Sequence, residues 1–328
     1  MKAALPLVDA TGIHWEIRDV PKPQVGPKQL LIRVRAASIN RGEATLLRTK
    51  FKQLGAPVPA MTIGGIDAAG EIEAIGEGVE RFKPGDRIAG RCAGGFAEFV
   101  VMNEFEAIAI PPSLDDVAAA CLPVSFVVAH DALIVQGNLS SSDWVLITGV
   151  TSAVGVAALG IAKFLGAKVI GTSGSADKLG RLAPLGLDLP IQTRAPDFAV
   201  AVKEVTGGRG VDIAIDAVGA AFFDAILQSL AVDGRFATIG QLTGSPKVTL
   251  DMDFFAMRRL HLFGVSNRLR TPDARARSAQ RFTKDLMDAI VAKRIHVQVD
   301  RTFPLDEIGA AHRYVYADQQ VGKVVITM

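Results

Sequence analysis

The stretch from Trp144 to Ala162 carries no charged residue, and it is the feature that most constrains the fold. It is long enough to cross a membrane, but Gly149, Gly155 and Gly160 interrupt it, together with threonines and a serine. A buried strand, a tight turn and a buried helix of small residues account for this pattern better than a membrane span does. The sequence therefore predicts a strand over 144–148 and a helix over 154–166.

Strand-like and helix-like segments alternate after this turn. Apolar runs predict strands over 168–172, 211–216, 234–240 and 260–264, with helices over 176–185 and 222–230 between them. Such alternation is typical of a doubly wound parallel sheet with helices on both faces.

The ends of the chain have a different character. Residues 1–115 alternate apolar and polar residues and are rich in prolines and glycines, which favours a compact antiparallel β unit. A charged helix is expected over 272–293, followed by a tail at 297–328 with strands around one short helix. The overall fold class predicted is α/β.

Composition excludes several classes of protein. The 328 residues suffice for two domains, at roughly 100–200 residues per domain. Lys and Arg total 36 against 34 Asp and Glu, so a net charge of +2 provides no basic surface for nucleic acid or a membrane. Two cysteines exclude a disulfide framework, and the apolar run after Met1 is too short for a signal peptide. We expect a cytoplasmic protein whose partner is a small molecule.

The turn between Thr148 and Gly155 has the composition of a dinucleotide-binding turn. Such a turn brings backbone N–H groups to a pyrophosphate at the N-terminus of the following helix. Ser152 and Ala153 stand where glycines would allow the closest approach. Ser152 could either crowd the phosphates or donate a hydrogen bond to one of them.

The end of the second strand distinguishes the two nicotinamide dinucleotides. An NAD site usually carries Asp or Glu about 20 residues after the glycines. Here residues 171–175 carry hydroxyl groups and no carboxylate. Ser173, Ser175 and Lys178, with Arg194 as a further candidate, could hold a 2′-phosphate, although each is as readily explained as part of a solvated helix start. The missing carboxylate favours NADPH.

Several motifs along nearly the whole chain are similar to those of a known family. They are Ala37-Ser-Ile-Asn40, Gly64-Gly-Ile-Asp-Ala-Ala-Gly70, Gly94-Gly-Phe-Ala-Glu-Phe99, the turn after 148, Thr206-Gly-Gly-Arg-Gly210 and Gly322-Lys-Val-Val. In this order they resemble the zinc-independent medium-chain dehydrogenase/reductases, specifically the NADPH:quinone oxidoreductase branch. Enone and enoyl-thioester reductases share most of them. The resemblance implies a GroES-like β catalytic domain at 1–118 and 266–328, with a Rossmann domain inserted at 119–265.

The resemblance also implies the place of the active site and its residues. The nicotinamide would lie in a cleft between the domains, and homodimers or homotetramers would form through residues 260–264. Asn40 would contact the nicotinamide or the substrate, unless it only makes a structural turn, and Glu43 would form a buried ion pair. His130 could donate a proton or pack at the domain seam. The residues expected to bind the cofactor are Val128, Ser152, Ala153, Val154, Ser173, Gly174, Ser175, Lys178, Arg194, Val218, Ile239, Gly240, Val265 and Ser266.

No metal is expected. Where zinc-dependent relatives carry their ligands this chain has Asn40, Ile66 and Val124, and none of these is a common zinc ligand. A shifted site made of Cys92, Cys121 and His130 has no recognisable zinc spacing.

The expected chemistry is one that needs little acid catalysis. Hydride addition to a quinone or an α,β-unsaturated carbonyl compound fits, because the developing charge is delocalised onto oxygen and water can supply the proton. An alternative is a reductase of an activated acrylate or enoyl thioester, with Arg41, Arg48 and Arg268 attracting the anionic group. An alternative of another class is a dinucleotide-binding sensor or structural protein without turnover.

Overall fold

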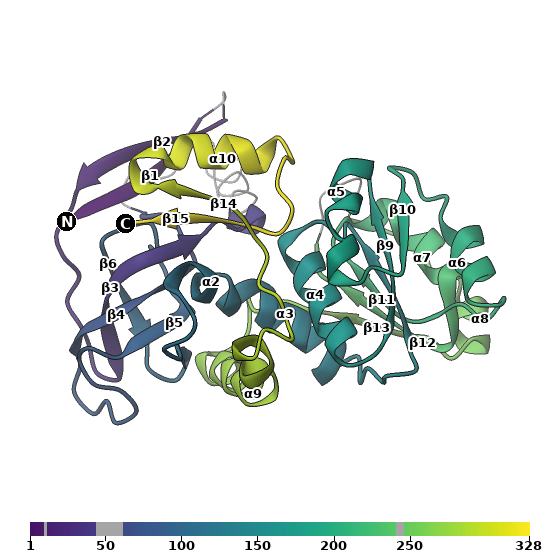
Figure 1. Cartoon of the computed structure of the whole chain (residues 1–328), viewed down its shortest axis with the longest axis horizontal. Coiled ribbons are helices and arrows are strands. Elements are labelled where there is room, and N and C mark those ends of the chain that lie inside the picture. The colour runs from purple at the N-terminus through teal and green to yellow at the C-terminus, as the bar shows by residue number, and fades with distance from the viewer. Residues whose placement is uncertain (10–11, 44–61, 241–245) are drawn as a thin grey trace. The chain divides into compact units, whose positions relative to one another are not determined.

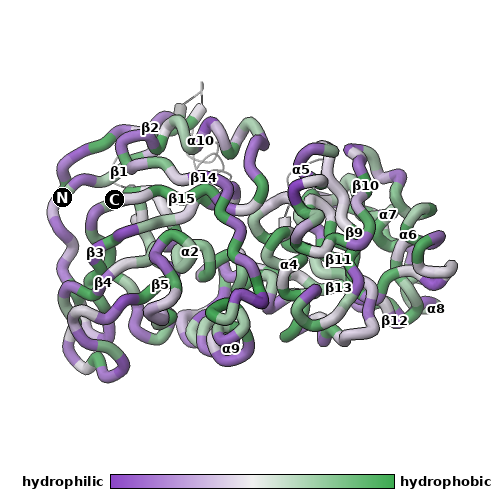
Figure 2. Tube along the Cα trace, in the orientation of Figure 1, coloured by the Kyte–Doolittle hydropathy of each residue, from purple (hydrophilic) through white to green (hydrophobic). Residues whose placement is uncertain are grey.

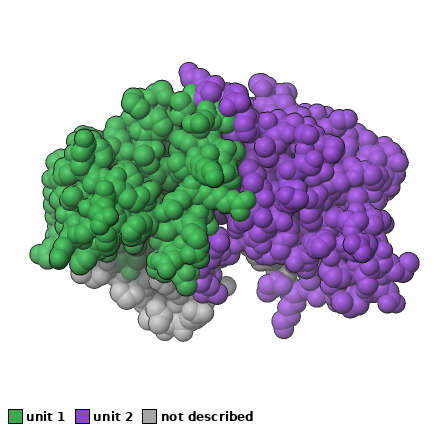
Figure 3. Space-filling view, turned by 90° about the horizontal axis from the view of Figure 1, so that it is seen from below, with its two compact units in different colours: residues 1–124, 271–291, 299–328 green, residues 125–270, 292–298 purple. Residues whose placement is uncertain are grey.

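The computed structural model describes residues 1–9, 12–43, 62–240 and 246–328, and the chain forms two compact units (Figures 1 and 3). Unit 1 consists of Met1–Val124, Thr271–Val291 and Val299–Met328. Unit 2 consists of Ser125–Arg270 and Ala292–Gln298. Each unit is built on its own sheet, as two domains require.

Unit 2 contains a parallel sheet of six strands. They are β8 (Trp144–Thr148), β9 (Lys168–Ser173), β10 (Leu189–Gln192), β11 (Val211–Asp216), β12 (Leu230–Thr238) and β13 (His261–Gly264). They lie in the order β10-β9-β8-β11-β12-β13, so the direction of the strand order reverses between β8 and β11. This is the arrangement of dinucleotide-binding doubly wound folds, whose ligands bind at the reversal point. The α/β prediction is confirmed.

Helices complete unit 2. Those that follow the strands are α4 (Ala153–Phe164), α5 (Ala176–Gly180), α6 (Ala199–Val205), α7 (Phe223–Ser229) and α8 (Met252–Met257). The side chains of α6 and α7 pack with Leu146 and Ile170 of the sheet in one buried cluster. Figure 2 shows that strands at the centre of this unit, such as β11, are mostly hydrophobic, as expected of a sheet covered on both faces.

The uncharged stretch is β8, the turn and α4, as the sequence predicts. Among the described residues, no helix combines the length and the apolar character needed to cross a membrane. The expected helix over 176–185 is instead two pieces, because α5 ends at Gly180 and Ala183–Leu185 forms a 3₁₀ turn. Pro184 explains the break, since its ring clashes with the carbonyl four residues earlier and it has no N–H to donate.

Unit 1 contains a mixed sheet in which strands from both ends of the chain pair. Its order is β14 (Val299–Pro304), β15 (Lys323–Thr327), β3 (Gln29–Ser38), β4 (Asp67–Ile75), β5 (Arg87–Arg91) and β7 (Ala107–Ala109), and β6 (Phe99–Asn103) also pairs with β3. A separate hairpin joins β1 (Lys2–Asp9) and β2 (Gly12–Asp19). The pairs are antiparallel except β14 and β15, which α10 (Ile308–Tyr316) connects as a crossover helix (Figure 1).

The helices between the two sheets along the chain are short, whereas the helix that follows unit 2 is long. The segment before unit 2 forms α2 (Asp116–Ala120), and the joint is a run of helical turns: a π-helical turn at Leu122–Phe126, α3 (Val127–His130) and a second π-helical turn at Asp131–Val135. The long helix is α9 (Pro272–Val291), whose buried residues recur at the spacing of one helix face.

The antiparallel pairing of β15 with β3 places Lys323, at the start of β15, in the same unit as Ser38 and Asn40.

Candidate active site

The turn after β8 packs tightly against the start of α4. Gly149 has φ of +64°, and a Cβ on Gly155 would lie 2.6 Å from the carbonyl oxygen of Gly149. Ser152 is the N-cap of α4, and its Oγ accepts the Gly155 N–H at 3.1 Å. The N–H groups of Ala153 and Val154 in the first turn have no acceptor within the helix, and the helix dipole favours an anion there. The hydroxyl hydrogen of Ser152 remains available to donate.

The end of β9 carries hydroxyl groups and two basic side chains. The Ser173 Oγ lies 3.3 Å from Thr151 Oγ1, and the Ser175 Oγ caps α5 by accepting the backbone N–H of Lys178 at 3.3 Å. Arg194 packs over the strand end so closely that a Cβ on Gly174 would lie 2.6 Å from its Nε and Cζ atoms. The guanidinium group of Arg194 therefore lies at the carboxyl end of β9, the segment in which the sequence predicts the 2′-phosphate site.

The expected cofactor-binding residues gather at one edge of the sheet. All except Val128 lie at or after the carboxyl end of a parallel strand: Ser152, Ala153 and Val154 follow β8; Ser173 ends β9, and Gly174, Ser175 and Lys178 follow it; Arg194 follows β10; Val218 follows β11; Ile239 and Gly240 follow β12; Val265 and Ser266 follow β13. Val128 is buried within α3. The edge formed by the carboxyl ends is where ligands bind in open α/β sheets.

Asp216, which the sequence analysis did not select, organises this edge. Its carboxylate accepts Thr148 Oγ1–H at 2.5 Å and the backbone N–H groups of Val218 and Gly219. Its carbonyl oxygen accepts the N–H groups of Ile239 and Gly240. Burial raises its pKa, and the donated hydrogen bonds oppose that rise. The sequence feature that could have identified Asp216 is its position as an acidic residue at the end of a buried strand.

In unit 1, five polar side chains form a cluster, which we call the Asn40 cluster: Ser38, Asn40, Glu43, Asp67 and Lys323. All of them are buried except Asn40, which is partly exposed. Lys323 Nζ donates to Asn40 Oδ1 and to Ser38 Oγ, both at 2.6 Å, and lies 3.7 Å from Asp67 Oδ2. Asn40 Nδ2 donates to Asp67 Oδ2 at 2.9 Å, and to the Ser38 carbonyl oxygen and Glu43 Oε1 at 3.2 Å each. The side chains of Lys323 and Asp67 are 2% and 0% exposed, so both charges are shielded from water.

Glu43 holds a proton more tightly than an ordinary glutamate. Burial and the nearby Asp67 carboxylate raise its pKa from 4.5 to about 8, against the opposing effects of Asn40, Lys323 and the Gly65 N–H. The Gly65 N–H donates to Glu43 Oε2 at 3.1 Å. Among the described residues the buried Lys323 ammonium pairs with Asp67 and not with Glu43. The carboxyl of Glu43 is instead connected to this ion pair through Asn40.

The other candidates are His130 and the two cysteines. His130 is buried in α3 of unit 2, whereas Asn40 belongs to unit 1. Burial raises the pKa of the Cys121 thiol to about 12, and burial together with Asp67 and Glu43 raises that of Cys92. The parts of the chain that the structure describes contain no group of three His, Cys, Asp or Glu arranged to hold a metal ion. Arg48 lies outside the described residues.

Comparisons with known proteins agree with this architecture. The alcohol dehydrogenase GroES-like domain matches residues 26–112, and the family described as zinc-binding dehydrogenase matches residues 153–283. A 2-haloacrylate reductase from Burkholderia sp. is 30% identical over 329 residues, which cover 95% of this chain and 94% of that enzyme. The chain belongs to the medium-chain dehydrogenase/reductase family.

Other relatives and solved structures are similar over most or all of this chain. A mycobacterial protein in complex with NADPH and a mycobacterial quinone oxidoreductase are each 28% identical, with full coverage of both chains and TM-scores of 0.86 and 0.85. The highly reducing polyketide synthase frbB of Dothideomycetidae sp. (strain 11243) is 28% identical over all of this chain, but the match covers only 12% of that synthase. The chain thus spans about an eighth of such relatives.

Proposed function

We propose that this medium-chain reductase is an NADPH-dependent, metal-independent oxidoreductase of the cytoplasm that transfers a hydride to a quinone or an α,β-unsaturated carbonyl compound. The observation that carries the proposal is the edge formed by the carboxyl ends of the strands in unit 2. There a glycine turn opens a helix, and Arg194 lies over a strand tip without a carboxylate. The NADPH-bound relative supports the choice of cofactor.

Each unit has its own part in this function. In unit 2, the N-terminus of α4 would hold the pyrophosphate, while Arg194, Lys178, Ser173 and Ser175 would hold the 2′-phosphate. The bound NADPH supplies the hydride. In unit 1, Asn40 would orient the carbonyl oxygen on which negative charge develops, and the proton would come from water. His130 is the alternative proton donor.

The proposal is tested by NADPH oxidation against a panel of one quinone, one enone and one acrylate, each repeated with NADH. We expect turnover with at least one acceptor and a preference for NADPH. Elemental analysis of the same preparation should find no stoichiometric zinc, and chelators should leave its rate unchanged. NADPH binding without oxidation of NADPH by any acceptor would indicate the sensor or structural protein instead.

A second candidate substrate class is favoured by the 2-haloacrylate reductase relative and by the polyketide synthase relatives. An acrylate or enoyl thioester carries an anionic or bulky polar group that the protein must attract. Arg41 is already engaged, since its Nη2 donates to the Val315 carbonyl oxygen and pairs with Asp318 at 2.9 Å. Arg268 is exposed and is the better candidate for this role. A higher kcat/KM for an acrylate than for a quinone would favour this class.

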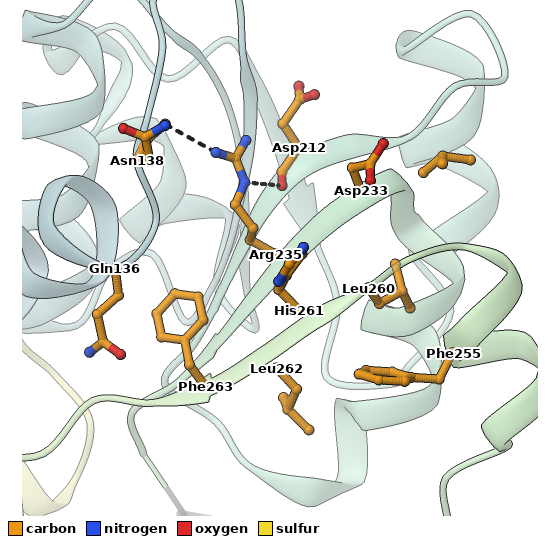
Figure 4. Close-up of a pocket in the computed structure, with 11 residues that line it drawn as sticks. Gln136, Asn138, Asp212, Asp233, Arg235, Phe255, Leu260, His261, Leu262 and Phe263 are labelled. Carbon is orange, nitrogen blue, oxygen red and sulfur yellow. Dashed lines mark hydrogen bonds between the residues drawn. The ribbon is translucent and has the colours of Figure 1, made fainter.

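We also propose that two copies pair through β13. This strand is at the edge of the sheet, and edge strands present N–H and C=O groups that can pair with another chain. Beside it lies a groove of about 880 Å³ in which Arg235 contacts the carbonyl oxygens of Asp212 and Asn138 (Figure 4). Leu262 in the same strand is 42% exposed, which a partner strand would cover.

A further inference from the structure

Lys323 has no role in the proposed function, yet it is among the least exposed charged residues of unit 1. Lysine is almost never fully buried unless it is paired. Here it directs two short hydrogen bonds to Ser38 and Asn40 and faces the Asp67 carboxylate. Keeping an ammonium group out of water is costly, and an apolar residue of similar size would often be as stable. The arrangement is therefore better explained by what Lys323 does to its neighbours.

The neighbour that Lys323 constrains most is Asn40. The oxygen and nitrogen ends of an asparagine amide are nearly identical in shape, so its hydrogen-bond partners determine which of the two orientations the amide adopts. Here Oδ1 faces the Lys323 ammonium at 2.6 Å, and Nδ2 faces the Asp67 carboxylate at 2.9 Å. Turning the amide by 180° would place its nitrogen against a cation and its oxygen against an anion. The buried pair of charges therefore selects a single orientation of the amide.

The hydrogens of Asn40 Nδ2 are not held equally. One is directed to Asp67 at 2.9 Å, which is the usual length of an N–H···O bond. The other is directed to the Ser38 carbonyl oxygen and Glu43 Oε1, both at 3.2 Å and at the long end of the range. A substrate oxygen can therefore replace or share the acceptors of this second hydrogen at the least loss, while the amide plane itself stays fixed.

We propose that Lys323 is a positioning residue, which with Asp67 fixes the Asn40 amide so that its second hydrogen is available to the reacting oxygen. This inference rests on the proposed role of Asn40. Lys323 does not touch the substrate, and its whole effect on turnover passes through Asn40. Removing its ammonium group should impair the reaction only as long as Asn40 is present.

A double-mutant cycle tests this dependence. Lys323→Met should lower kcat/KM by about threefold to tenfold, and no more than Asn40→Ala does, while the Kd for NADPH stays unchanged. In the Asn40→Ala background, Lys323→Met should cause less than a twofold further loss. An equal loss in both backgrounds, or no loss in the wild-type background, would overturn the proposal.

Loss of fold must be distinguished from loss of positioning, because Lys323→Met alone leaves a buried Asp67 carboxylate without its cation. The double variant Lys323→Met/Asp67→Asn removes both charges and should recover the melting temperature, yet it should keep the kinetic defect. Lys203→Met is the control, since Lys203 is a partly buried lysine that also makes two hydrogen bonds, to the backbone carbonyl oxygens of Arg209 and Leu230 in unit 2. It should leave kcat/KM at the wild-type value.

A measurement without turnover separates this inference from the proposed function. The side-chain amide signals of Asn40, identified in an NMR spectrum by their loss in Asn40→Ala, should exchange with solvent at least tenfold faster in Lys323→Met/Asp67→Asn than in the wild type. Unchanged exchange would refute the positioning role even if the enzyme is active. If exchange is faster but none of the acceptors in the panel supports NADPH oxidation, the proposed function is refuted and the positioning role is retained.

Discussion

Replacing Glu43 by Gln should flatten the pH dependence of the stability of unit 1. The folded protein keeps a proton on Glu43 up to a pKa of about 8, whereas the unfolded chain loses it near 4.5. Between these values the folded state binds one more proton than the unfolded state does. The free energy of unfolding therefore falls as the pH rises, by about 1.4 kcal/mol per pH unit. The contribution of Glu43 is fully present below pH 4.5 and is lost as the pH passes about 8.

The size of this effect follows from the burial of the cluster. Integrated from 4.5 to about 8, the loss approaches about 5 kcal/mol. That is comparable to the whole stability of a typical domain, at roughly 5–15 kcal/mol. Gln resembles the protonated acid in shape and stays neutral at every pH. The variant should therefore be more stable than the wild type at pH 8 and above, where the wild type must either bury a second carboxylate or unfold.

The assay is urea denaturation at several values from pH 5 to 9, followed by tryptophan fluorescence. The chain has only two tryptophans, so Trp144→Phe leaves Trp15 as a reporter of unit 1 alone. In this background Glu43→Gln should remove a slope of about 1.4 kcal/mol per pH unit. Glu71→Gln, on the same sheet but with a side chain 48% exposed, is the matched control and should keep the wild-type slope. Parallel lines for the wild type and Glu43→Gln between pH 5 and 8 would show that Glu43 is charged in the folded protein.

Three further results are expected. Lys178→Ala and Arg194→Ala should each weaken NADPH binding by roughly 1–3 kcal/mol, the range for a charged hydrogen bond, and leave NADH binding almost unchanged; equal losses for both cofactors would show that neither side chain reaches the 2′-phosphate. Asn40→Ala should lower kcat/KM by about tenfold, while His130→Phe should leave kcat nearly intact, because general acids contribute about 10²–10⁴-fold and none is required here; a hundredfold loss in His130→Phe would make His130 the acid. Leu262→Asp should yield monomers in light scattering if β13 pairs two chains, since a buried charge opposes the interface; an unchanged oligomer would exclude that strand.

Local patterns in the sequence were sufficient to predict the strand, the turn and the helix at 144–164. The strand at 144–148, the glycine turn and the small-residue helix are contiguous, and each carries its own signal in a few residues. Strand β10 was missed because it contains Pro190, which is tolerated there only because β10 lies at the edge of the sheet. Whether a segment occupies an edge depends on the packing of the whole unit, and a window of a few residues does not contain that information.

The Asn40 cluster was out of reach of the sequence for a related reason. Asn40 and Glu43 were recognised from one short motif, but Lys323, the partner of Asn40, lies 283 residues from it along the chain. Antiparallel pairing of β15 with β3 brings them together, and nothing near Lys323 in the sequence marks it as buried. Asp216 was missed for another reason. Its strand was predicted, but no pattern in the sequence indicates that its carboxylate accepts backbone N–H groups from the loop that follows the strand.

The composition of the Asn40 cluster links the stability of unit 1 to its proposed chemistry. The cluster holds two carboxyl groups and one ammonium group, so it is electrically neutral only while one carboxyl keeps its proton, and Glu43 is the one whose pKa is about 8. A neutral Glu43 is a weak acceptor, which leaves the second hydrogen of Asn40 Nδ2 available to a substrate. An ionised Glu43 would accept that hydrogen strongly at Oε1, because hydrogen bonds to charged groups are about twice as strong as neutral ones. It follows that kcat/KM of the wild type should fall above about pH 8, and that Glu43→Gln should remove this fall. A wild-type profile that stays flat to pH 9.5 would mean that Asn40 does not share its hydrogen between Glu43 and the substrate.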